Sequence, residues 1–283
     1  MSDLRRRSLL TGVAGGTLAA MAAAAPRASA APNEVQNIFS AAVAWRQTAA
    51  ERDMLYIQGF NLAKARLDAA LAQRHRHRHG RRRKKLVFIS DIDDTVLDSN
   101  SYWALLLAAG KQAFDDPLWD EWVAANGPTA TPGAVDFTHY ARRRGVQIFY
   151  VSSRDQGPNT QQYGIANLKK AGLAFADDAH VTILRDSSNK EPAQQAIAAK
   201  YDVIAYLGDN LNDFRRRYYV NSVQQRKQLA MEDAEHFGSD YILFPNNTDG
   251  HWLKAIFGDS EPPDTPEYRR RMLEAAMGKL NAP

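Results

Sequence analysis

The sequence predicts an α/β protein built on a doubly wound parallel sheet, and two observations support this fold class. Five short, nearly continuous apolar runs occur along the chain, and segments with helical periodicity separate them. Continuous apolar runs indicate strands that are buried on both faces. Their alternation with helices is typical of right-handed βαβ units, which form an open sheet with helices on both sides.

The elements are expected in the following order. Residues 33–73 carry apolar side chains at helical spacing and predict a helix, with Gly59 as a weak point. Strands are expected in "KLVFISD" and at residues 145–154, 180–186, 201–210 and 239–247. Helices are expected between them at residues 135–144, 160–171 and 191–200.

The first 30 residues are predicted to be an export signal rather than part of the fold. Arg6 and Arg7 precede an uncharged run of small and apolar residues, and an A-x-A type cleavage site ends at Ala30. The paired arginines followed by "SLLT" favour the twin-arginine export machinery. A membrane anchor is the alternative, but alanine and glycine make the run weakly apolar. We therefore expect a periplasmic or secreted protein without a stable membrane anchor.

The amino-acid composition limits the classes of function that this chain could have. The 283 residues include no cysteine, so the hydrophobic core must stabilise an exported chain without disulfides. Eight of the 36 basic residues lie in one tract at residues 74–85, so the net charge of +4 is a local property. This tract could bind a polyanion or, through its histidines, a transition metal, while a solvated linker is the alternative. Nucleic acid is not an expected partner of the rest of the chain.

Polar side chains stand at the carboxyl ends of four predicted strands. They are Asp91 and Asp93 after the first strand, Ser152 in the second, Lys190 after the third, and Asp209 and Asp213 after the fourth. Ligands of open parallel sheets bind beyond these strand ends. The sequence therefore predicts that these groups converge on one crevice.

This set of groups suits phosphoryl transfer. Several nearby carboxylates repel unless a cation neutralises them, and Lys190 together with Mg²⁺ would do so. One carboxylate could form an aspartyl-phosphate, and a carboxyl two residues on, Asp93, could protonate the leaving oxygen and later activate water. Ser152 and Lys190 would position the phosphoryl group.

Other interpretations of the aspartates fit less well. An EF-hand loop that starts at Asp91 would have Thr95, Val96 and Tyr102 at positions 5, 6 and 12, and one that starts at Asp209 would have Phe214 at position 6. A bare D-x-D site for metal and a nucleotide-sugar does not explain the serine and lysine. The motifs contain no cysteine or histidine cluster for structural zinc, and an acidic turn without function would bury unpaired charge.

Four segments in order resemble the motifs of the haloacid dehalogenase-like phosphohydrolases. They are "DIDDT", "YVSSR", Lys190 in "SSNKEP", and "GDNLNDF". Further segments are similar to bacterial class C acid phosphatases, the 5′-nucleotidase lipoprotein type: "WRQTAAERDMLYIQGFNLAKARLD", "DPLWDEWV", "TPGAVDF" and "FPNNTDGHW". The resemblance extends from about residue 44 to about residue 252.

The resemblance implies a role for each motif residue. Asp91 would be the nucleophile and Asp93 the general acid and base. Asp91, the backbone carbonyl of Asp93, and Asp209 would bind Mg²⁺. Asp213 would orient Lys190 or a metal-bound water, and Thr95, Arg154 and Asn210 would support the site.

The resemblance also implies a domain organisation and an activity. Residues 31–85 would form N-terminal helices and a basic linker, residues 86–258 the phosphatase core with an α-helical cap insert at about 98–140, and residues 259–283 a helical tail. The N-terminal helices would join the cap. The expected activity is exported, Mg²⁺-dependent hydrolysis of phosphomonoesters, with 5′-nucleotides as substrates. A non-catalytic phosphate-ligand or polyanion-binding protein on the same scaffold is the alternative.

Substrate binding is where the sequence departs from the family. Trp119 matches an aromatic residue that stacks on the nucleoside base, although a cap-core tryptophan paired with Trp122 is the alternative. Asp249 stands where the family has a tyrosine that would stack on the other face of the base. An aspartate cannot stack and would repel a second anionic group, so base preference stays open. The lipid-bearing cysteine of the family is absent.

Overall fold

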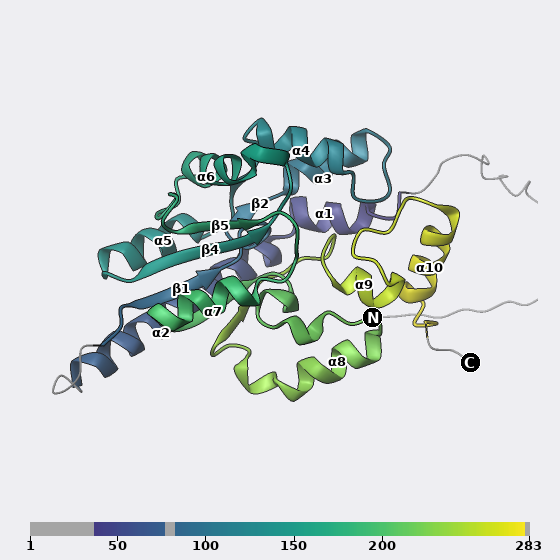
Figure 1. Cartoon of the computed structure of the whole chain (residues 1–283). Helices are drawn as coiled ribbons and strands as arrows, with labels where there is room; N and C mark the ends of the chain where they lie inside the picture. Colours follow the sequence, from purple (N-terminus) through teal and green to yellow (C-terminus); the bar gives the residue numbers. More distant parts are fainter. Residues whose placement is uncertain (1–36, 77–82, 281–283) are drawn as a thin grey trace, which may run out of the picture. The chain divides into compact units, whose positions relative to one another are not determined.

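The protein is described by a computed structural model that covers residues 37–76 and 83–280. Its centre is a five-stranded parallel sheet in the order β5-β4-β1-β6-β7 (Figure 1). The strands are β1 (Leu86–Ser90), β4 (Gln147–Ser153), β5 (Val181–Leu184), β6 (Asp202–Gly208) and β7 (Tyr241–Leu243). Each lies within a predicted run, so the predicted fold class and its five strands are confirmed.

The strand order creates one favoured binding position. From β1 the chain adds β4 and β5 on one side of the sheet and then returns to add β6 and β7 on the other. The connections that leave β1 and β5 therefore run in opposite directions across the sheet. Such a switch point opens a crevice at the carboxyl ends of the central strands. Asp91 directly follows β1 and lies at this point.

The predicted N-terminal helix over residues 33–73 is two helices in the structure. They are α1 (Ser40–Thr48) and α2 (Ala50–Arg76), and Ala49 between them has an extended backbone with ψ 115°. The N-terminal helices expected from the resemblance are therefore present, but the continuous periodic pattern did not predict the turn at Ala49. Helix α2 continues through Gly59, where a Cβ atom would lie only 2.5 Å from the Phe244 ring. Glycine therefore allows the segment after β7 to pack closely on α2.

Three of the other helices coincide with the predicted segments to within one residue. They are α5 (Ala134–Arg143), α6 (Thr160–Lys170) and α7 (Glu191–Lys200). The helices α8 (Val223–Glu232) and α9 (Trp252–Phe257) have no counterpart among the predicted elements, and neither do the 3-10 turns η1 (Gly157–Asn159), η2 (Leu211–Asp213), η3 (Arg216–Tyr218) and η4 (Ala234–His236). Helix α10 (Pro266–Ala276) lies in the expected tail.

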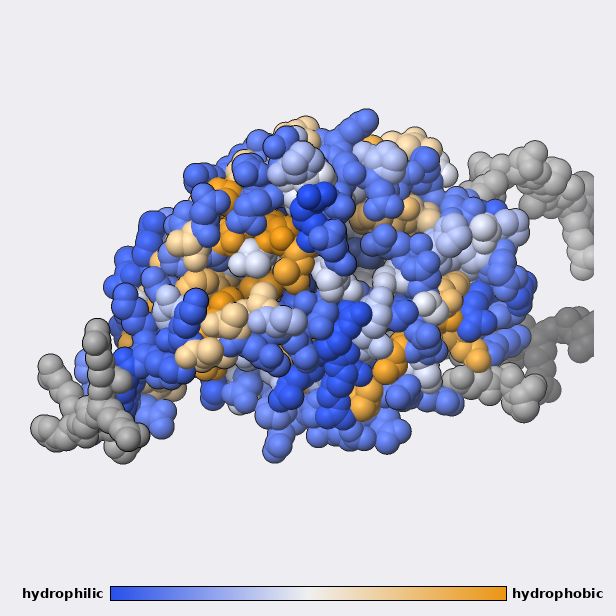
Figure 2. Space-filling model, viewed as in Figure 1, coloured by the Kyte–Doolittle hydropathy of each residue, from blue (hydrophilic) through white to orange (hydrophobic). Residues whose placement is uncertain are grey.

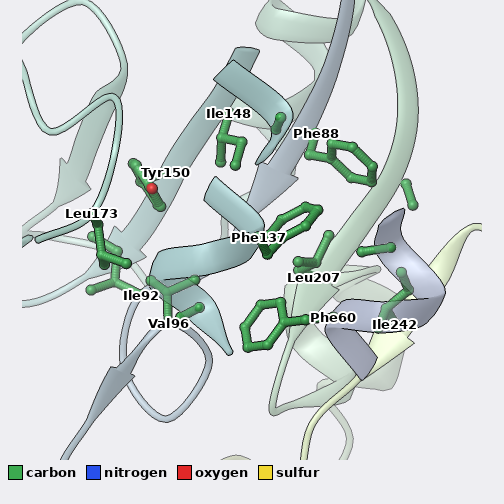
Figure 3. Close-up of a cluster of buried hydrophobic side chains, with 14 of the residues drawn as sticks. Phe60, Phe88, Ile92, Val96, Phe137, Ile148, Tyr150, Leu173, Leu207 and Ile242 are labelled. Atoms are coloured by element: carbon green, nitrogen blue, oxygen red, sulfur yellow. The ribbon is translucent and has the colours of Figure 1, made fainter. Parts of the chain in front are cut away.

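The main core lies between one face of the sheet and the helices α2 and α5. Phe137 of α5 stacks on Phe60 of α2 at 5.4 Å and meets Phe88 of β1 edge-on at 5.2 Å (Figure 3). Successive residues of a strand face opposite sides. Val87 and Ile89 of β1 are therefore buried on the other face, on the side of α7. Because β1 is buried on both faces, its position and the position of Asp91 are tightly fixed.

A second hydrophobic cluster covers the carboxyl ends of the strands. It comes from the start of α1 and from α3 (Asn100–Ala108) and α4 (Asp116–Ala124), with Trp103 and Trp122 among its buried side chains. The short antiparallel strands β2 (Leu97–Asp98) and β3 (Thr129–Ala130) flank this helical insert. Helix α5 packs in the main core instead, although residues 134–140 of this helix fall within the expected cap segment.

The face seen in Figure 2 is mostly hydrophilic, with hydrophobic residues gathered in smaller areas. Within residues 37–76 and 83–280, none of the helices combines the length and the apolar character that crossing a bilayer requires. The predicted export signal in residues 1–30 and the middle of the basic tract lie outside the described residues. At the edges of the tract, Arg74 pairs with Asp202 at 2.6 Å, and Lys84 bonds to the carbonyl of Ala198 at 3.3 Å.

Candidate active site

The predicted site residues come together at one cavity of about 370 Å³ beyond the carboxyl ends of the strands. Its lining includes all six strand-end groups, namely Asp91, Asp93, Ser152, Lys190, Asp209 and Asp213. Arg154, Asn210, Trp119 and Asp249 border the same cavity. Thr95 lies just behind it and is fully buried. The convergence expected from the sequence is therefore what the structure has.

Lys190 holds two of the carboxylates together. It stands at the N-cap position of α7 and is 9% exposed. Its Nζ forms ion pairs with Asp91 and with Asp213 Oδ1, the latter at 2.7 Å. Burial lowers the pKa of Lys190, but the charges of Asp213 and Asp91 outweigh burial and keep the pKa above its usual value. Lys190 is therefore a permanent cation beside Asp91.

One lysine does not neutralise all the acidic groups here. Carboxylate oxygens of Asp91, Asp209 and Asp213 lie within 4.8 Å of one another. Burial, together with the charges of Asp213 and Asp91, raises the pKa of Asp209 well above its usual value. We call Asp91, Lys190, Asp209 and Asp213 the strand-end cluster. Because it holds three carboxylates and one cation, its donors suit a hard divalent ion, which binds oxygen ligands.

The carboxylate of Asp93 faces a different partner. Arg154 Nε donates to its Oδ2 at 2.6 Å, Arg154 Nη2 pairs with its Oδ1, and Ser152 Oγ lies 3.5 Å from Oδ2. Burial raises the pKa of Asp93, while the charge of Arg154 opposes this shift. Asn167 in α6 fixes Arg154 by accepting from its Nη1 at 2.9 Å. The side chain of Asp93 is thus set apart from the strand-end cluster.

Hydrogen bonds fix the conformation of the loop after β6. The backbone N–H of Asn210 donates to Asp213 Oδ2 at 2.8 Å, which forms a capping box at η2. A side chain at Gly208 would collide with Asp213, so glycine permits this close turn. Arg226 of α8 is buried and donates to Asn210 Oδ1 at 2.9 Å. The sequence analysis missed Arg226, which lies 16 residues after Asn210 in an element that was not predicted.

Thr95 links two members of the strand-end cluster. Its Oγ1 lies 3.3 Å from Asp91 Oδ2 and 3.3 Å from Asp209 Oδ1. The hydroxyl therefore bridges the loops that follow β1 and β6, in keeping with its expected supporting place.

Trp119 packs in the cap core and also borders the cavity. Its ring centroid lies 4.9 Å from that of Trp122 and 5.0 Å from that of Tyr102, so it packs in the cap cluster. It also borders the cavity, with the Arg154 guanidinium 5.9 Å from its ring. The side chain thus contributes to the cap core and presents part of its surface to the cavity.

Asp249 lies at an acidic part of the cavity wall. Burial, and after it the charge of Glu261, raises the pKa of Asp249 to about 7. Glu261, Asp116 and Asp120 border the same cavity. The wall near Asp249 is therefore rich in carboxyl groups, and Asp249 itself becomes negatively charged only as the pH rises through about 7.

Three further polar residues near the site escaped the sequence analysis. They are Arg46 of α1, Asp94 in the loop after β1, and Asn246 in the loop after β7. Asp94 and Asn246 stand inside the quoted segments "DIDDT" and "FPNNTDGHW", which was a usable signal. Arg46 likewise stands inside the quoted segment "WRQTAAERDMLYIQGFNLAKARLD", but its partners are distant in the chain.

Comparison with known proteins identifies relatives of the whole fold. The sequence profile of the HAD superfamily, subfamily IIIB (acid phosphatase), matches residues 8–252. Two crystal structures of the class C acid phosphatase from Bacillus anthracis, one with tungstate bound, are 32% identical and cover 83% of this chain and 94% of theirs. Their TM-scores are 0.73 for the tungstate complex and 0.74 for the other structure.

Curated relatives match a shorter part of the chain. A stem 31 kDa glycoprotein and a stem 28 kDa glycoprotein of Glycine max are 28% and 27% identical over 135 and 136 residues. These matches cover 45% and 46% of this chain. They cover 51% and 52% of the two relatives, so this chain spans about half the length of either. The family profile and the crystal structures extend over most of the chain, and on their evidence this protein belongs to the acid phosphatases of HAD superfamily subfamily IIIB.

Proposed function

We propose that this protein is a Mg²⁺-dependent acid phosphatase that hydrolyses phosphomonoesters, with 5′-nucleotides as substrates, through an aspartyl-phosphate on Asp91. The observation that carries the proposal is the position of Asp91 at the end of the central strand. Its carboxylate borders the cavity, pairs with Lys190 and lies within 4.8 Å of two further carboxylates. Family membership supports the same reaction class.

In the first step, a carboxylate oxygen of Asp91 attacks phosphorus, and the bond between phosphorus and the leaving oxygen breaks. The leaving oxygen takes a proton from the carboxyl group of Asp93. Burial raises the pKa of Asp93, which favours the protonated form before the step. Arg154 then stabilises the carboxylate that remains, because it donates to both oxygens.

In the second step, the carboxylate of Asp93 accepts a proton from water, and the water oxygen attacks phosphorus. The bond between phosphorus and Asp91 breaks, inorganic phosphate leaves, and Asp91 returns as a carboxylate. Asp93 ends protonated, ready for the next substrate. Lys190 and Ser152 border the cavity and would hold the transferring phosphoryl oxygens.

Mg²⁺ would be held by the carboxylates of Asp91 and Asp209 and by the backbone carbonyl of Asp93. When bound, the ion would offset the negative charge of the phosphoryl group. Asp213 would remain paired with Lys190, as its 2.7 Å contact suggests. The donor set fits the ion, since all the donors are oxygens and the cluster has three carboxylates but only one cation, Lys190.

Two features of the cavity bear on the substrate. The exposed surface of Trp119 supports an aromatic leaving group such as a nucleoside. Once ionised, the carboxyl groups of Asp249 and Glu261 on the wall would oppose additional phosphates. Nucleoside 5′-monophosphates are therefore favoured over diphosphates and triphosphates.

The export signal expected in residues 1–30 supports a periplasmic or secreted location, reached through the twin-arginine export machinery.

The experiment that tests the proposal is phosphate release by the purified protein with Mg²⁺ and with a chelator. The substrate panel holds nucleoside 5′-mono-, di- and triphosphates, a 3′-nucleotide, an aryl phosphate and sugar phosphates. We expect Mg²⁺-dependent release that is fastest with 5′-monophosphates. Release from aryl or sugar phosphates alone would retain the reaction and refute the nucleotide preference. No release from any ester by folded, metal-bound protein would refute the activity and favour a phosphate-binding scaffold.

A further inference from the structure

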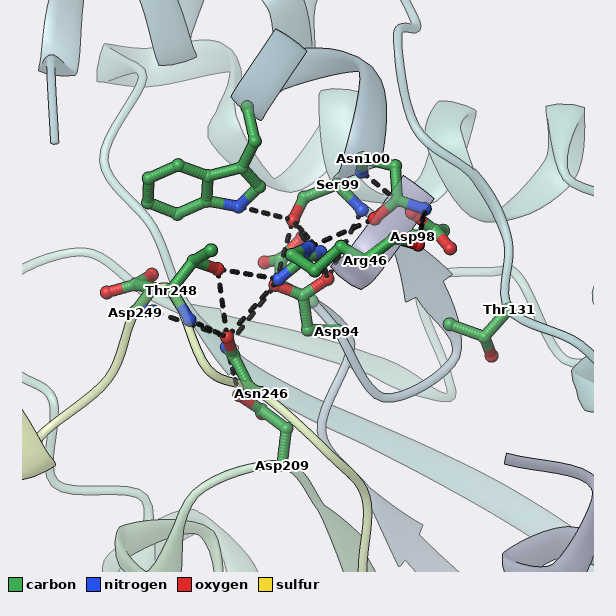
Figure 4. Close-up of polar contacts among 12 residues, drawn as sticks. Arg46, Asp94, Asp98, Ser99, Asn100, Thr131, Asp209, Asn246, Thr248 and Asp249 are labelled. Atoms are coloured by element: carbon green, nitrogen blue, oxygen red, sulfur yellow. Dashed lines mark hydrogen bonds and ion pairs between the residues drawn. The ribbon is translucent and has the colours of Figure 1, made fainter. Parts of the chain in front are cut away.

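A second buried polar cluster lies beside the proposed active site, and the mechanism does not use it. Its centre is Arg46 of α1, paired with Asp94, and it reaches the loop that follows β7 (Figure 4). We propose that Asn246 is a positioning residue, which Arg46 and Asp94 hold in place and which orients the Asp209 carboxylate for a divalent cation. This inference rests on the proposed function for the identity of the cation site.

Asp209 depends on Asn246 for its orientation. Among the described residues, the Asp209 carboxylate accepts hydrogen bonds from Thr95 Oγ1 at 3.3 Å and from Asn246 Nδ2 at 2.8 Å. The ion pairs of Lys190 go to the other two carboxylates of the strand-end cluster. The contact with Asn246 is therefore the shortest that holds this side chain.

The contacts of Asn246 decide which end of its amide faces Asp209. Its Oδ1 lies at hydrogen-bond distance from four donors: Thr248 N and Oγ1, both at 3.1 Å, Asp249 N at 3.2 Å, and Arg46 Nη1 at 3.2 Å. An amide oxygen accepts and an amide nitrogen donates. The Nδ2 group must therefore be the end that faces the carboxylates of Asp209 and Asp94, the latter at 3.3 Å.

Arg46 gives this arrangement a rigid anchor. It is 3% exposed and donates to the Asp94 carboxylate, to Ser99 Oγ at 2.8 Å, to Thr248 Oγ1 at 2.7 Å and to Asn100 Oδ1 at 3.0 Å. A guanidinium has donors in a fixed planar fork, so several bonds at once fix its place. We call Arg46, Asp94, Ser99, Asn100 and Thr248 the α1 cluster.

The α1 cluster ties together segments that all reach the active site. Asp94 lies three residues after Asp91, and its backbone has a positive φ of 51°, which marks a tight turn in that loop. Tyr56 Oη lies 2.7 Å from the carbonyl oxygen of Asp94 and 3.2 Å from that of Pro245, so α2 joins the same two loops. The N-terminal helices therefore support the metal site without lining it.

A partner that fixes a metal ligand changes metal affinity. Removing such an outer partner typically weakens metal binding by about 10-fold to 100-fold. Without the amide of Asn246, the Asp209 carboxylate would keep only the longer contact with Thr95. It would then have to be ordered by the ion itself, at a cost in binding free energy.

The test is calorimetric titration of Mg²⁺ into the full chain without substrate. Asn246→Ala is compared with Asn247→Ala, a neighbouring amide on the same loop that contacts the carbonyl of Ala42 at 3.3 Å and lies away from Asp209. We expect the Mg²⁺ dissociation constant to rise about 10-fold to 100-fold for Asn246→Ala, and to stay within about twofold for Asn247→Ala. Equal Mg²⁺ affinity of Asn246→Ala and the wild type would overturn the proposal.

Thermal melting in chelator separates positioning from a purely structural role. A structural role alone would lower the melting temperature of the metal-free variant and leave Mg²⁺ affinity unchanged, which also refutes the proposal. Should Asn246→Ala fail to fold, Asn246→Ser takes its place, because serine is too short to reach Asp209. Arg46→Lys keeps the charge but loses the fork, so we expect it to weaken Mg²⁺ binding by a smaller factor.

The titration also separates this inference from the proposed function. A wild-type protein that binds Mg²⁺ but hydrolyses no ester would refute the activity, while the comparison of Asn246→Ala with Asn247→Ala would still decide the positioning role.

Discussion

Two buried charge clusters lie side by side at the carboxyl ends of the strands, and they differ in their balance of charge. The strand-end cluster has three carboxylates but only one lysine. Burial and the acidic neighbours of Asp209 raise the pKa of this residue. In the α1 cluster, burial also raises the pKa of Asp94, but the ion pair with Arg46 outweighs burial and the pKa is lowered overall. The strand-end cluster, with its excess of negative charge, is suited to receive a cation and a phosphoryl group, while the balanced α1 cluster is suited to hold loops in place.

The largest difference between the two clusters should appear when a residue of the strand-end cluster is replaced and catalysis is measured. Asp91→Asn removes the proposed nucleophile and leaves Lys190 paired with Asp213, so the fold should survive. We expect kcat to fall by about 10⁴-fold or more, as when a nucleophile is deleted in other enzymes. Initial rates of phosphate release, with thermal melting as the fold control, would measure this. Activity within about tenfold of the wild type would show that Asp91 is not the nucleophile.

Asp94→Asn should act on stability instead. It leaves the buried guanidinium of Arg46 without a counter-charge, and such a loss costs about 3–5 kcal/mol of unfolding free energy. Urea unfolding of Asp94→Asn and Asp91→Asn, both in chelator, would measure the contrast. Equal unfolding free energies for the two variants would contradict the distinction between a balanced and an unbalanced cluster.

The two clusters also differ in how far the sequence could predict them. Asp91, Ser152 and Asp209 stand at the ends of apolar runs, and Lys190 follows the third run at the start of a helix. Local pattern and the geometry of parallel sheets were therefore enough to bring these residues together. The ion pair between Arg46 and Asp94 joins residues 48 positions apart, and the bond from Arg46 to Asn246 spans 200 positions. A local pattern contains no signal for such pairings.

Local sequence pattern was limited in the same way in predicting the helices and strands. The five strands are short apolar runs, which a periodicity argument detects, whereas the break at Ala49 is a single turned backbone within a continuous helical pattern. That break places α1 across the cap, where Arg46 can reach Asp94. The missed break and the missed cluster therefore have one cause, which is that tertiary contacts decide where α1 ends.

Divalent cations should stabilise the strand-end cluster and leave the α1 cluster unaffected. At about 100 times its dissociation constant, a bound ion adds about 2.7 kcal/mol to the unfolding free energy. We expect Mg²⁺ to raise the melting temperature of the wild type and of Asp94→Asn, and a chelator to reverse the effect. Asp209→Asn should lose this Mg²⁺ effect, because it removes one of the proposed ligands. A full Mg²⁺ effect in Asp209→Asn would exclude that residue from the ion site.

Asp249 lies in the cavity wall, outside both clusters, and its substitution has the smallest expected effect on stability. Its pKa is raised to about 7 by burial and then by Glu261, and no ion pair joins it to a cation within the described ranges. Between about pH 4 and pH 7 the folded protein therefore binds this proton more tightly than the unfolded chain does. The stability that Asp249 contributes is complete at the acidic end of this window and is lost as the pH rises through about 7.

Asp249→Asn should therefore flatten the fall in stability across this window, by about 2 kcal/mol after allowance for solvent screening. Urea unfolding of the wild type and the variant at several pH values, all in chelator, would measure the difference. Asp136→Asn is the matched control, because the hydrogen bond from Lys64 lowers the pKa of exposed Asp136. Asp136 therefore titrates below this window, and its loss should leave the slope between about pH 4 and pH 7 unchanged. If wild type and Asp249→Asn lost stability in parallel from about pH 4 to pH 7, Asp249 would be ionised throughout, and the acidic wall would repel substrate anions even in acid.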